Sequence, residues 1–187
     1  MVTCVMASPR QKGNTATILS KIVQALKDKG ARVNEIYLAD ADIKYCIGCK
    51  VCYKTGVCVL QDDVKKIVDA MFSSDLILLA SPSYWGDVTG QMKVFIDRCT
   101  PYCNNNEARM PTPANIKGAA LAIRAGTNKR ENENLIHTME HFLGHLNIPL
   151  EAQLTFEGVD TENDITAEVL EKAYLFGVGL SKKLPKA

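Results

Sequence analysis

Four of the chain's seven cysteines fall within thirteen residues, with the spacing C-x2-C-x2-C-x5-C (Cys46, Cys49, Cys52 and Cys58). Thiolates at such short intervals can surround a compact metal centre, and C-x2-C-x2-C is the core of bacterial ferredoxin binding runs. In those runs the fourth cysteine follows after three residues, precedes proline and serves another cluster. Here it follows after five residues and precedes Val59, which suits a single self-contained iron–sulfur cluster.

Two other uses of four neighbouring thiols compete with a cluster. Zinc can take four thiolates, although structural zinc sites usually draw them from two separated C-x-x-C pairs. A redox disulfide is the second alternative, but it would leave two of the four cysteines without a role. We find no secretory leader and no apolar run of the roughly 20 residues that span a bilayer. We therefore expect a cytoplasmic protein, whose reducing surroundings favour metal or redox chemistry over a disulfide framework.

The other cysteines and the histidines carry less distinctive signals. Cys4 falls in an apolar run and is expected in the core. Cys99 and Cys103 flank a predicted helix end, where we expect inert thiols, with an auxiliary redox or ligand role as the alternative. All three histidines recur at i, i+4 and i+8 of one predicted helix, opposite its apolar side: His137, His141 and His145. That placement favours a solvated or subunit-contact face over a metal site.

Short apolar segments alternate along the chain with longer amphipathic ones. The apolar segments predict buried strands over residues 2–7, 32–38, 75–82, 119–126 and 149–156. The amphipathic segments predict helices over residues 15–30, 62–74, 89–100, 131–147 and 165–184. Such alternation implies parallel pairing through right-handed crossovers. We therefore expect an α/β fold, one domain over residues 1–187, with helices on both faces of a five-stranded parallel sheet.

The amino-acid composition of the chain excludes some classes of binding partner. The chain is 47% hydrophobic and 23% charged, as is typical of soluble globular proteins. Its net charge is +1, so no basic field predicts binding to nucleic acid. Together with the absence of an apolar membrane-length run, this leaves small molecules and other proteins as the expected partners.

Open parallel sheets bind ligands beyond the carboxyl ends of their strands, so the loops after the predicted strands form the candidate site. The first loop, SPRQKGNT (8–15), enters a helix whose free N–H groups and positive dipole end suit a phosphate. An ordinary helix cap in a turn is the alternative, but it would explain only one or two of these residues. The loop is neither G-x-G-x-x-G nor G-x-x-x-x-G-K-[ST], which excludes the usual dinucleotide and ATP loops.

Two further loops complete the candidate site. The loop SPSYWGDVTG (81–90) holds the chain's only Trp beside a Tyr, and aromatic side chains there can line a flat ring. Residue type alone favours the alternative, in which both aromatic side chains cap the core. The loop RAGTNK (124–129) is small and polar and can close over the far side of a ligand.

Three segments together resemble the NAD(P)H-dependent FMN reductase superfamily, and within it the iron–sulfur flavoprotein branch: SPRQKGNT, CIGCKVCYKTGVCVLQDD and SPSYWGDVTGQMKVFIDR. The resemblance covers about the first 100 residues in detail and the remainder in topology only. It implies a flavodoxin-like three-layer sandwich with strand order 2-1-3-4-5. It also implies FMN, with the phosphate on Ser8, Arg10, Gly13, Asn14 and Thr15. The isoalloxazine ring would contact Pro82, Ser83, Tyr84, Trp85, Gly86 and Asp87, with further contacts from Ala125 and Gly126.

The same resemblance implies a [4Fe–4S] cluster on the four clustered cysteines. FMN accepts electrons in pairs and passes them singly, whereas a cluster accepts one at a time. We therefore expect a flavin-dependent oxidoreductase that couples two-electron to one-electron transfer, with NAD(P)H or a redox protein as partner. The family tends to form homodimers or homotetramers. We expect the cysteine loop on the ligand side of the sheet, and Asp97 and Arg98 as a structural charge pair near the second loop.

Two other functions stay open. Some relatives keep similar cysteines without a demonstrated cluster, so an NAD(P)H-dependent FMN or quinone reductase without iron is the first alternative. A flavin- or zinc-binding module without turnover is the second. Iron in the purified protein separates the first alternative from the expected function, and oxidation of pyridine nucleotide separates the second.

Overall fold

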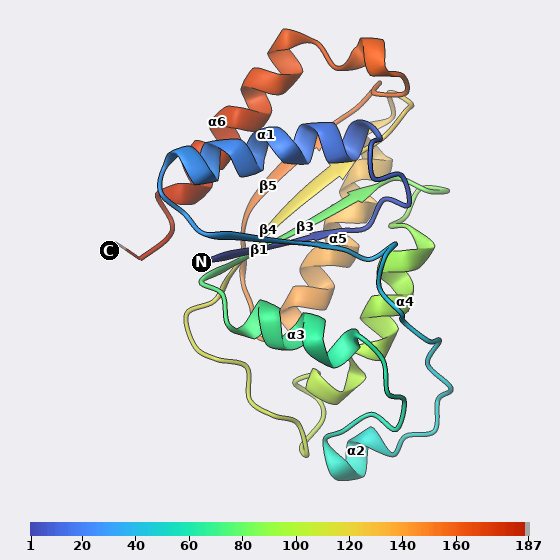
Figure 1. Ribbon diagram of the computed structural model, residues 1–187. Helices are drawn as coiled ribbons and strands as arrows, with labels where there is room; N and C mark the ends of the chain where they lie inside the picture. Colours follow the sequence, from blue (N-terminus) through green and yellow to red (C-terminus); the bar gives the residue numbers. More distant parts are fainter. Residues whose placement is uncertain (186–187) are drawn as a thin grey trace.

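The computed structural model describes residues 1–185 and contains a five-stranded, all-parallel sheet in the order β2-β1-β3-β4-β5 (Figure 1). In chain order the strands are β1 (Val2–Met6), β2 (Val33–Tyr37), β3 (Leu76–Pro82), β4 (Lys117–Ile123) and β5 (Leu150–Phe156). The predicted α/β class, parallel pairing and flavodoxin-like strand order are confirmed. Because β1 lies between β2 and β3, the chain reverses its direction of winding after β2, which opens a crevice at the carboxyl edge.

Helices cover both faces of the sheet, as predicted (Figure 1). On one face α1 (Asn14–Asp28) and α6 (Ala167–Ser181) lie side by side. The other face carries α3 (Val64–Phe72), α4 (Gly90–Arg98) and α5 (Lys129–His145). Short helical turns interrupt the connections: α2 (Cys52–Thr55), η1 (Thr100–Tyr102) and η2 (Glu162–Asp164). None of the helices in residues 1–185 is both long and apolar enough to cross a membrane.

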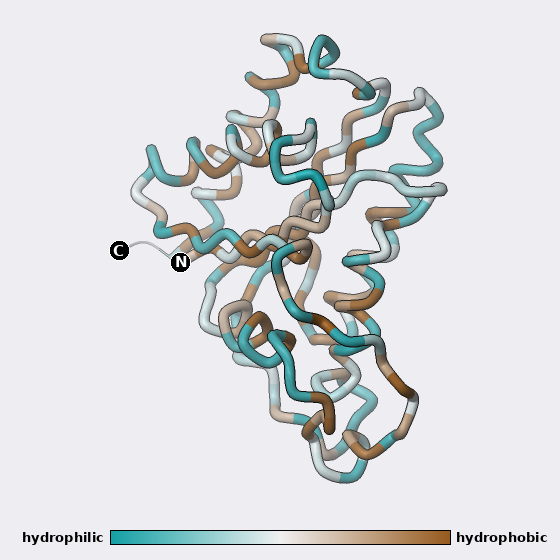
Figure 2. The backbone as a smooth tube through the Cα atoms, turned by 45° about the vertical axis from the view of Figure 1, so that its right-hand side comes forward, coloured by the Kyte–Doolittle hydropathy of each residue, from teal (hydrophilic) through white to brown (hydrophobic). Residues whose placement is uncertain are grey.

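The core lies in two layers, one on each side of the sheet. Strands β1, β3 and β4 read as nearly continuous apolar runs because both of their faces are buried under helices. Figure 2 shows the hydrophobic stretches converging on the centre of the molecule. Where α6 crosses α1, a Cβ at Gly177 would lie 2.5 Å from the carbonyl oxygen of Ile22. A glycine at this position therefore allows the two helices to pack closely.

Two predicted element boundaries differ from the structure in an informative way. The fourth strand runs from Lys117 to Ile123 rather than over 119–126. Its last predicted residues form a loop, in which Gly126 accepts a hydrogen bond from the N–H of Gly158. The cysteine segment, for which no helix is predicted, contains the four-residue helix α2, which ends at Gly56 with a left-handed φ of 70°. Both differences come from turns that short-range periodicity does not reveal.

Candidate functional site

The first candidate loop ends at an uncapped helix. Gly13 is the N-cap of α1 in an extended conformation, no side chain caps the helix, and no acidic residue lies in its first turn. A Cβ at Gly13 would lie 3.0 Å from the Cβ of Arg10, so the turn is tight at this point. Backbone N–H groups at the start of α1 are therefore without a side-chain partner in the described structure, and the helix dipole adds positive potential.

Side chains of the same loop fix its shape. The buried Ser8 hydroxyl accepts a hydrogen bond from the N–H of Arg10 at 3.1 Å. The amide nitrogen of Asn14 donates to the carbonyl oxygen of Thr161 at 3.0 Å, so it ties α1 to the loop after β5. Thr15 is buried and the Arg10 side chain is exposed. Of the predicted phosphate contacts, Asn14 thus has a bond within the protein, and Arg10 is free to move towards a ligand.

The second candidate loop turns back on itself at its aromatic tip. The N–H of Tyr84 donates to the carbonyl oxygen of Asp87 at 2.9 Å, and the N–H of Asp87 donates to that of Tyr84 at 3.3 Å. Between them Trp85 and Gly86 have left-handed φ values of 57° and 77°. The Trp85 side chain is fully exposed, and Tyr84 is 43% exposed. The interpretation that these aromatic residues cap the core is therefore wrong, and a left-handed Trp costs roughly 1–2 kcal/mol.

The third loop is held by Arg124 together with Glu131, a residue that the sequence patterns did not single out. Arg124 donates to the carbonyl oxygen of Asn128 at 2.5 Å and pairs with Glu131 at 3.0 Å. Glu131 also accepts a hydrogen bond from the Ser83 hydroxyl at 3.4 Å. It therefore links the second and third loops, and its only signal in the sequence is an acidic residue at the start of a predicted helix.

Thr89 joins the first and second loops. Its hydroxyl donates to the carbonyl oxygen of Ala7 at 2.8 Å and accepts from the N–H of Met92 at 3.2 Å, which caps α4. The N–H of Ser83 donates to the carbonyl oxygen of Ile123 at 2.7 Å, which connects the second loop to the end of β4. The three candidate loops thus lie together at the carboxyl ends of β1, β3 and β4, the edge where a parallel sheet binds its ligand.

The four clustered cysteines lie apart from these loops and line a cavity of about 240 Å³. Cys46 and Cys49 are exposed, Cys52 and Cys58 are half-buried, and all four are free thiols. In residues 1–185 no three His, Cys, Asp or Glu side chains are gathered closely enough to hold a metal ion. Burial, and then the negative charges of Cys58 and Cys49, raise the pKa of Cys52. A bound cation would offset this repulsion when the four groups are thiolates.

The cysteine loop joins the carboxyl end of β2 to the start of α3, so it leaves the sheet at the ligand edge, as expected. Tyr45, next to Cys46, lines a cavity there with Pro9 and Gly90, whereas the four thiols lie further along the loop. After β2 the chain runs past α4 to α2, which lies below α3 in the view of Figure 1. The cavity of the four cysteines is closed by Arg98, Thr100 and Pro101, at the end of α4 opposite the aromatic loop. The nine residues of α4 span about 13 Å, and they separate the two candidate sites.

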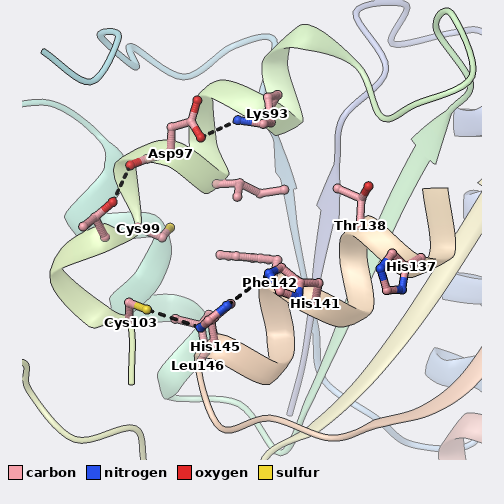
Figure 3. Close-up of a pocket in the computed structure, with 12 residues that line it drawn as sticks. Lys93, Asp97, Cys99, Cys103, His137, Thr138, His141, Phe142, His145 and Leu146 are labelled. Atoms are coloured by element: carbon pink, nitrogen blue, oxygen red, sulfur yellow. Dashed lines mark hydrogen bonds and ion pairs between the residues drawn. The ribbon is translucent and has the colours of Figure 1, made fainter. Parts of the chain in front are cut away.

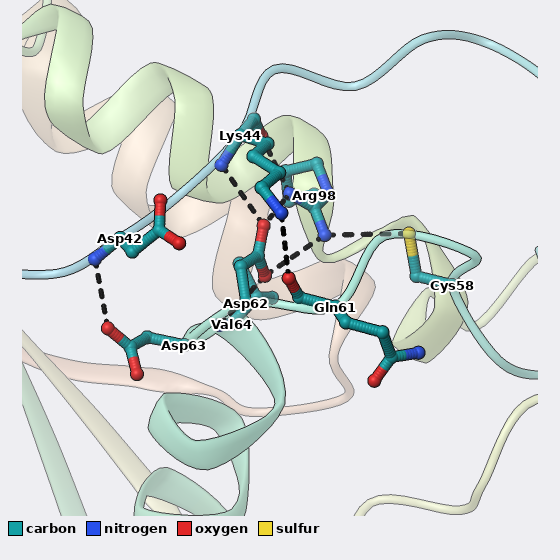
Figure 4. A network of polar contacts seen from close by, with 8 residues as sticks. All are labelled: Asp42, Lys44, Cys58, Gln61, Asp62, Asp63, Val64 and Arg98. Atoms are coloured by element: carbon teal, nitrogen blue, oxygen red, sulfur yellow. Dashed lines mark hydrogen bonds and ion pairs between the residues drawn. The ribbon is translucent and has the colours of Figure 1, made fainter.

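A buried ion pair holds the base of this loop (Figure 4). The side chains of Arg98 and Asp62 are each 1% exposed. Arg98 binds Asp62 through both terminal nitrogens and donates to the carbonyl oxygen of Lys44 at 2.6 Å. Desolvation acts to raise the pKa of Asp62, but hydrogen bonds from Arg98, Lys44 and Val64 hold it below its ordinary value.

The predicted pairing of Asp97 with Arg98 near the second loop is therefore wrong. Asp97 instead pairs with Lys93 at 2.5 Å on the exposed side of α4. Adjacent residues on a helix point about 100° apart, so one of the two can be buried while the other faces solvent. Arg98 has a structural role, as expected, but its side chain holds the cysteine loop rather than the aromatic loop.

A second group of contacts holds the tip of the cysteine loop. The buried amide of Asn106 donates to the carbonyl oxygens of Cys52 at 3.1 Å and Pro101 at 3.2 Å. A Cβ at Gly56 would lie 2.2 Å from the carbonyl oxygen of Ala108, so only glycine fits there. The long connection over 101–117, for which no helix or strand is predicted, thus supports the cysteine segment.

Helices α4 and α5 border a third cavity, of about 440 Å³, lined by all three histidines (Figure 3). The Cys103 sulfur lies 3.4 Å from Nδ1 of His145, and Nε2 of His145 lies 3.1 Å from Nε2 of His141. His137 and His141 are exposed, as expected for a solvated face, but His145 is half-buried against Cys103. Cys99 is buried, and burial raises the pKa of its thiol well above the ordinary value.

Comparison with known proteins identifies a matching family and several relatives. The model of the family "NADPH-dependent FMN reductase" matches residues 1–157. An iron-sulfur flavoprotein of Archaeoglobus fulgidus is 35% identical over 127 residues, which make up 68% of this chain but 56% of that protein. Iron-sulfur flavoprotein MJ1083 of Methanocaldococcus jannaschii is 33% identical over 141 residues, 75% of this chain and 70% of that protein.

Solved structures agree on the fold. The NAD(P)H:quinone oxidoreductase from Methanothermobacter marburgensis superposes with a TM-score of 0.71 at 17% identity, covering 96% of each chain. The chain spans little more than half the length of the Archaeoglobus relative, so the whole activity of that protein does not transfer with the match. The matched family model, the shared sequence and the three-layer fold together show that the chain belongs to the NADPH-dependent FMN reductase family.

Proposed function

We propose that the chain is an FMN-dependent oxidoreductase that also carries a [4Fe–4S] cluster and couples two-electron flavin chemistry to one-electron transfer. The observation that carries the proposal is the presence of two separate candidate sites on one small fold. One is an uncapped helix beside an exposed aromatic loop, and the other is a cavity lined by four free cysteines. Family membership supports the flavin, and the names of the two relatives support the cluster.

The residues at the carboxyl edge fit FMN. The unpaired N–H groups at the start of α1 would hold the phosphate, Gly13 would let it approach the backbone, and Arg10 would add a positive charge. The segment Pro82 to Asp87 would border the flavin ring, with Ala125 and Gly126 on the far side. Trp85 is held in solvent by its strained turn, and this favours a role against a bound ring rather than in the core.

The residues of the cysteine loop fit an iron–sulfur cluster as a donor set. All four thiols line one cavity, and no acidic or histidine side chain lines it apart from Asp97 at its rim. Iron in such a cluster takes one thiolate per metal, which matches Cys46, Cys49, Cys52 and Cys58 in number and type. When bound, FMN and the cluster supply paired and single electron transfer respectively, and the protein positions them and tunes their potentials.

NAD(P)H or a redox protein would supply the electrons. The exposed aromatic loop leaves room for a nicotinamide to stack on a bound flavin without a dinucleotide fingerprint. Several large apolar side chains of the cysteine segment are exposed: Tyr45, Ile47, Tyr53, Val57 and Val59. Such a patch favours association with another protein surface, in keeping with a homodimer or homotetramer in the cytoplasm.

A pair of cysteine substitutions tests the proposal. Cys49→Ala removes one cluster ligand, so we expect the anaerobically purified variant to lose its iron and its one-electron transfer while FMN stays bound. Cys103→Ala is the matched control, because this thiol lies outside the loop and lines a different cavity. Equal loss of iron and FMN from a folded Cys49→Ala protein would contradict the assignment of two independent sites.

A second candidate function has one observation in its favour. The family model that matches residues 1–157 is that of NADPH-dependent FMN reductases and does not name a cluster, which supports an NAD(P)H-dependent FMN or quinone reductase without one. That function predicts NAD(P)H oxidation that is unchanged in Cys49→Ala. The proposed function predicts that reduction of a one-electron acceptor is lost in the same variant.

A further inference from the structure

Arg98 connects the two ends of the cysteine loop. It donates to the carbonyl oxygen of Lys44, two residues before Cys46, and binds the carboxylate of Asp62, four residues after Cys58. Asp62 in turn accepts a hydrogen bond from the N–H of Lys44 at 3.0 Å. Lys44 Nζ also donates to the carbonyl oxygen of Gln61 at 3.0 Å, so Lys44 itself is bonded to both Gln61 and Asp62. The loop is therefore closed at its base around one guanidinium.

The same guanidinium reaches a cysteine sulfur. Nη2 of Arg98 lies 3.5 Å from the sulfur of Cys58, and Figure 4 shows this contact beside the ion pair with Asp62. The Arg98 side chain is 1% exposed, and its Nε is buried without a hydrogen-bond partner among residues 1–185. A buried cation with a spare donor at the wall of a thiol-lined cavity is suited to negatively charged sulfur ligands.

We propose that Arg98 is a positioning residue for the iron–sulfur site, which holds Cys58 in place and raises the reduction potential of the cluster through its N–H···S contact. The proposal rests on the proposed function, since it requires a cluster on these cysteines. Asp62 acts in the opposite direction, because its carboxylate offsets the positive charge beside the sulfur.

The direction of the shift in reduction potential follows from the charge that the cluster gains on reduction. One-electron reduction by an external reductant adds one negative charge to the cluster without transfer of a proton or a bond change. A hydrogen-bond donor on a ligand sulfur stabilises the more negative state, so it raises the potential, and hydrogen bonds to sulfur are among the established determinants of cluster potentials. The burial of Arg98 and Asp62 strengthens both effects, because solvent screens buried charges weakly.

Two substitutions separate this role from a merely structural one. Arg98→Lys keeps a positive charge for Asp62 but loses the planar fork that reaches Cys58. We expect its equilibrium constant for cluster reduction to fall about tenfold, which corresponds to about 59 mV for a one-electron couple. Asp62→Asn keeps the shape of the side chain and removes the negative charge, so we expect its potential to rise. Asp69→Asn, an exposed carboxylate that pairs with Lys65 on α3 and does not line the cysteine cavity, is the control and should leave the potential unchanged.

The experiment is a potentiometric titration of the cluster in intact FMN-loaded protein, followed by EPR, with iron content and thermal melting measured on the same samples. Opposite shifts in Arg98→Lys and Asp62→Asn support the proposal. Wild-type potentials in both variants, or shifts of the same sign, overturn it, even if both variants melt at lower temperature. If Arg98→Lys loses its iron, the sign of the shift in Asp62→Asn decides. A wild-type protein without iron after anaerobic reconstitution overturns the proposed function, and this inference with it.

Discussion

The Gly13→Asp substitution places a carboxylate at the start of α1, where we propose that the FMN phosphate binds. Gly13 has an extended backbone with φ of −84°, which aspartate adopts without strain, and the helix has no side-chain cap to lose. Aspartate is a better N-cap than glycine by a few tenths of a kcal/mol, and its negative charge interacts favourably with the positive end of the helix dipole. The apoprotein should therefore be more stable than Gly13→Ala, which places the same Cβ against Arg10 without a cap, whereas FMN should bind more weakly.

The size of the binding loss follows from Coulomb's law. A carboxylate about 4 Å from one unit of phosphate charge costs roughly 1 kcal/mol in water and about 4 kcal/mol at an effective dielectric constant near 20. Because Gly13 is half-buried, we expect about 2 to 4 kcal/mol. At about 1.4 kcal/mol per factor of ten, FMN affinity should fall roughly 30- to 700-fold.

Two matched variants isolate the charge. Gly13→Ala introduces the same Cβ, 3.0 Å from the Cβ of Arg10, without a cap or a charge. Gly13→Asn adds a neutral cap of nearly the same shape. The assay is a fluorescence titration of each apoprotein with FMN and with riboflavin, which lacks the phosphate, together with thermal melting. The account is refuted if Gly13→Asp binds FMN as tightly as Gly13→Asn does, or if riboflavin binding falls by the same factor.

Three shorter predictions concern other parts of the molecule. Trp85→Ala should change the free energy of unfolding by less than about 0.5 kcal/mol, since the side chain is fully exposed, yet weaken FMN binding in the same titration. Gly56→Ala should lower iron per chain at constant FMN, because the new Cβ would lie 2.2 Å from the Ala108 carbonyl oxygen. The lowered pKa of Asp62 stabilises the fold fully above its ordinary value of 3.8 and progressively less as pH falls through the folded value. Asp62→Asn should remove that part of the acid dependence in urea unfolding of the apoprotein.

The sheet could be predicted because its determinants are local. Buried parallel strands require continuous apolar runs such as LILLAS in β3, and alternation with amphipathic segments leaves few topologies. The strand-to-helix loops were placed correctly for the same reason, since the carboxyl ends of parallel strands share one edge. The spacing of the cysteine motif leads to the proposal of a cluster independently of the rest of the fold.

Contacts between distant segments could not be predicted in this way. The pairing of Arg98 with Asp62 joins residues 36 positions apart, and Asn106 reaches back 54 positions to Cys52. Periodicity predicts that α4 is a helix, but it does not show that the side chain of its last residue, Arg98, binds the base of the cysteine loop. The exposure of Trp85 was missed because residue type favours burial, whereas the left-handed turn at Trp85 and Gly86 directs the side chain into solvent.

The contact between Cys103 and His145 was missed for a related reason. His145 follows the histidine spacing of α5, but the thiol comes from the segment after α4, 42 residues earlier. Only the packing of the two helices brings these side chains together (Figure 3). Sequence patterns therefore located the candidate loops, while the residues that support them depended on the tertiary structure.

The central claim is that one chain carries both FMN and an iron–sulfur cluster. Its most direct test is the amount of iron, acid-labile sulfide and flavin per chain in protein purified without oxygen, with visible and EPR spectra of the same sample. The account predicts about four irons with matching sulfide beside one FMN, as a [4Fe–4S] cluster requires. One FMN per chain without iron or sulfide, even after anaerobic reconstitution, would contradict it.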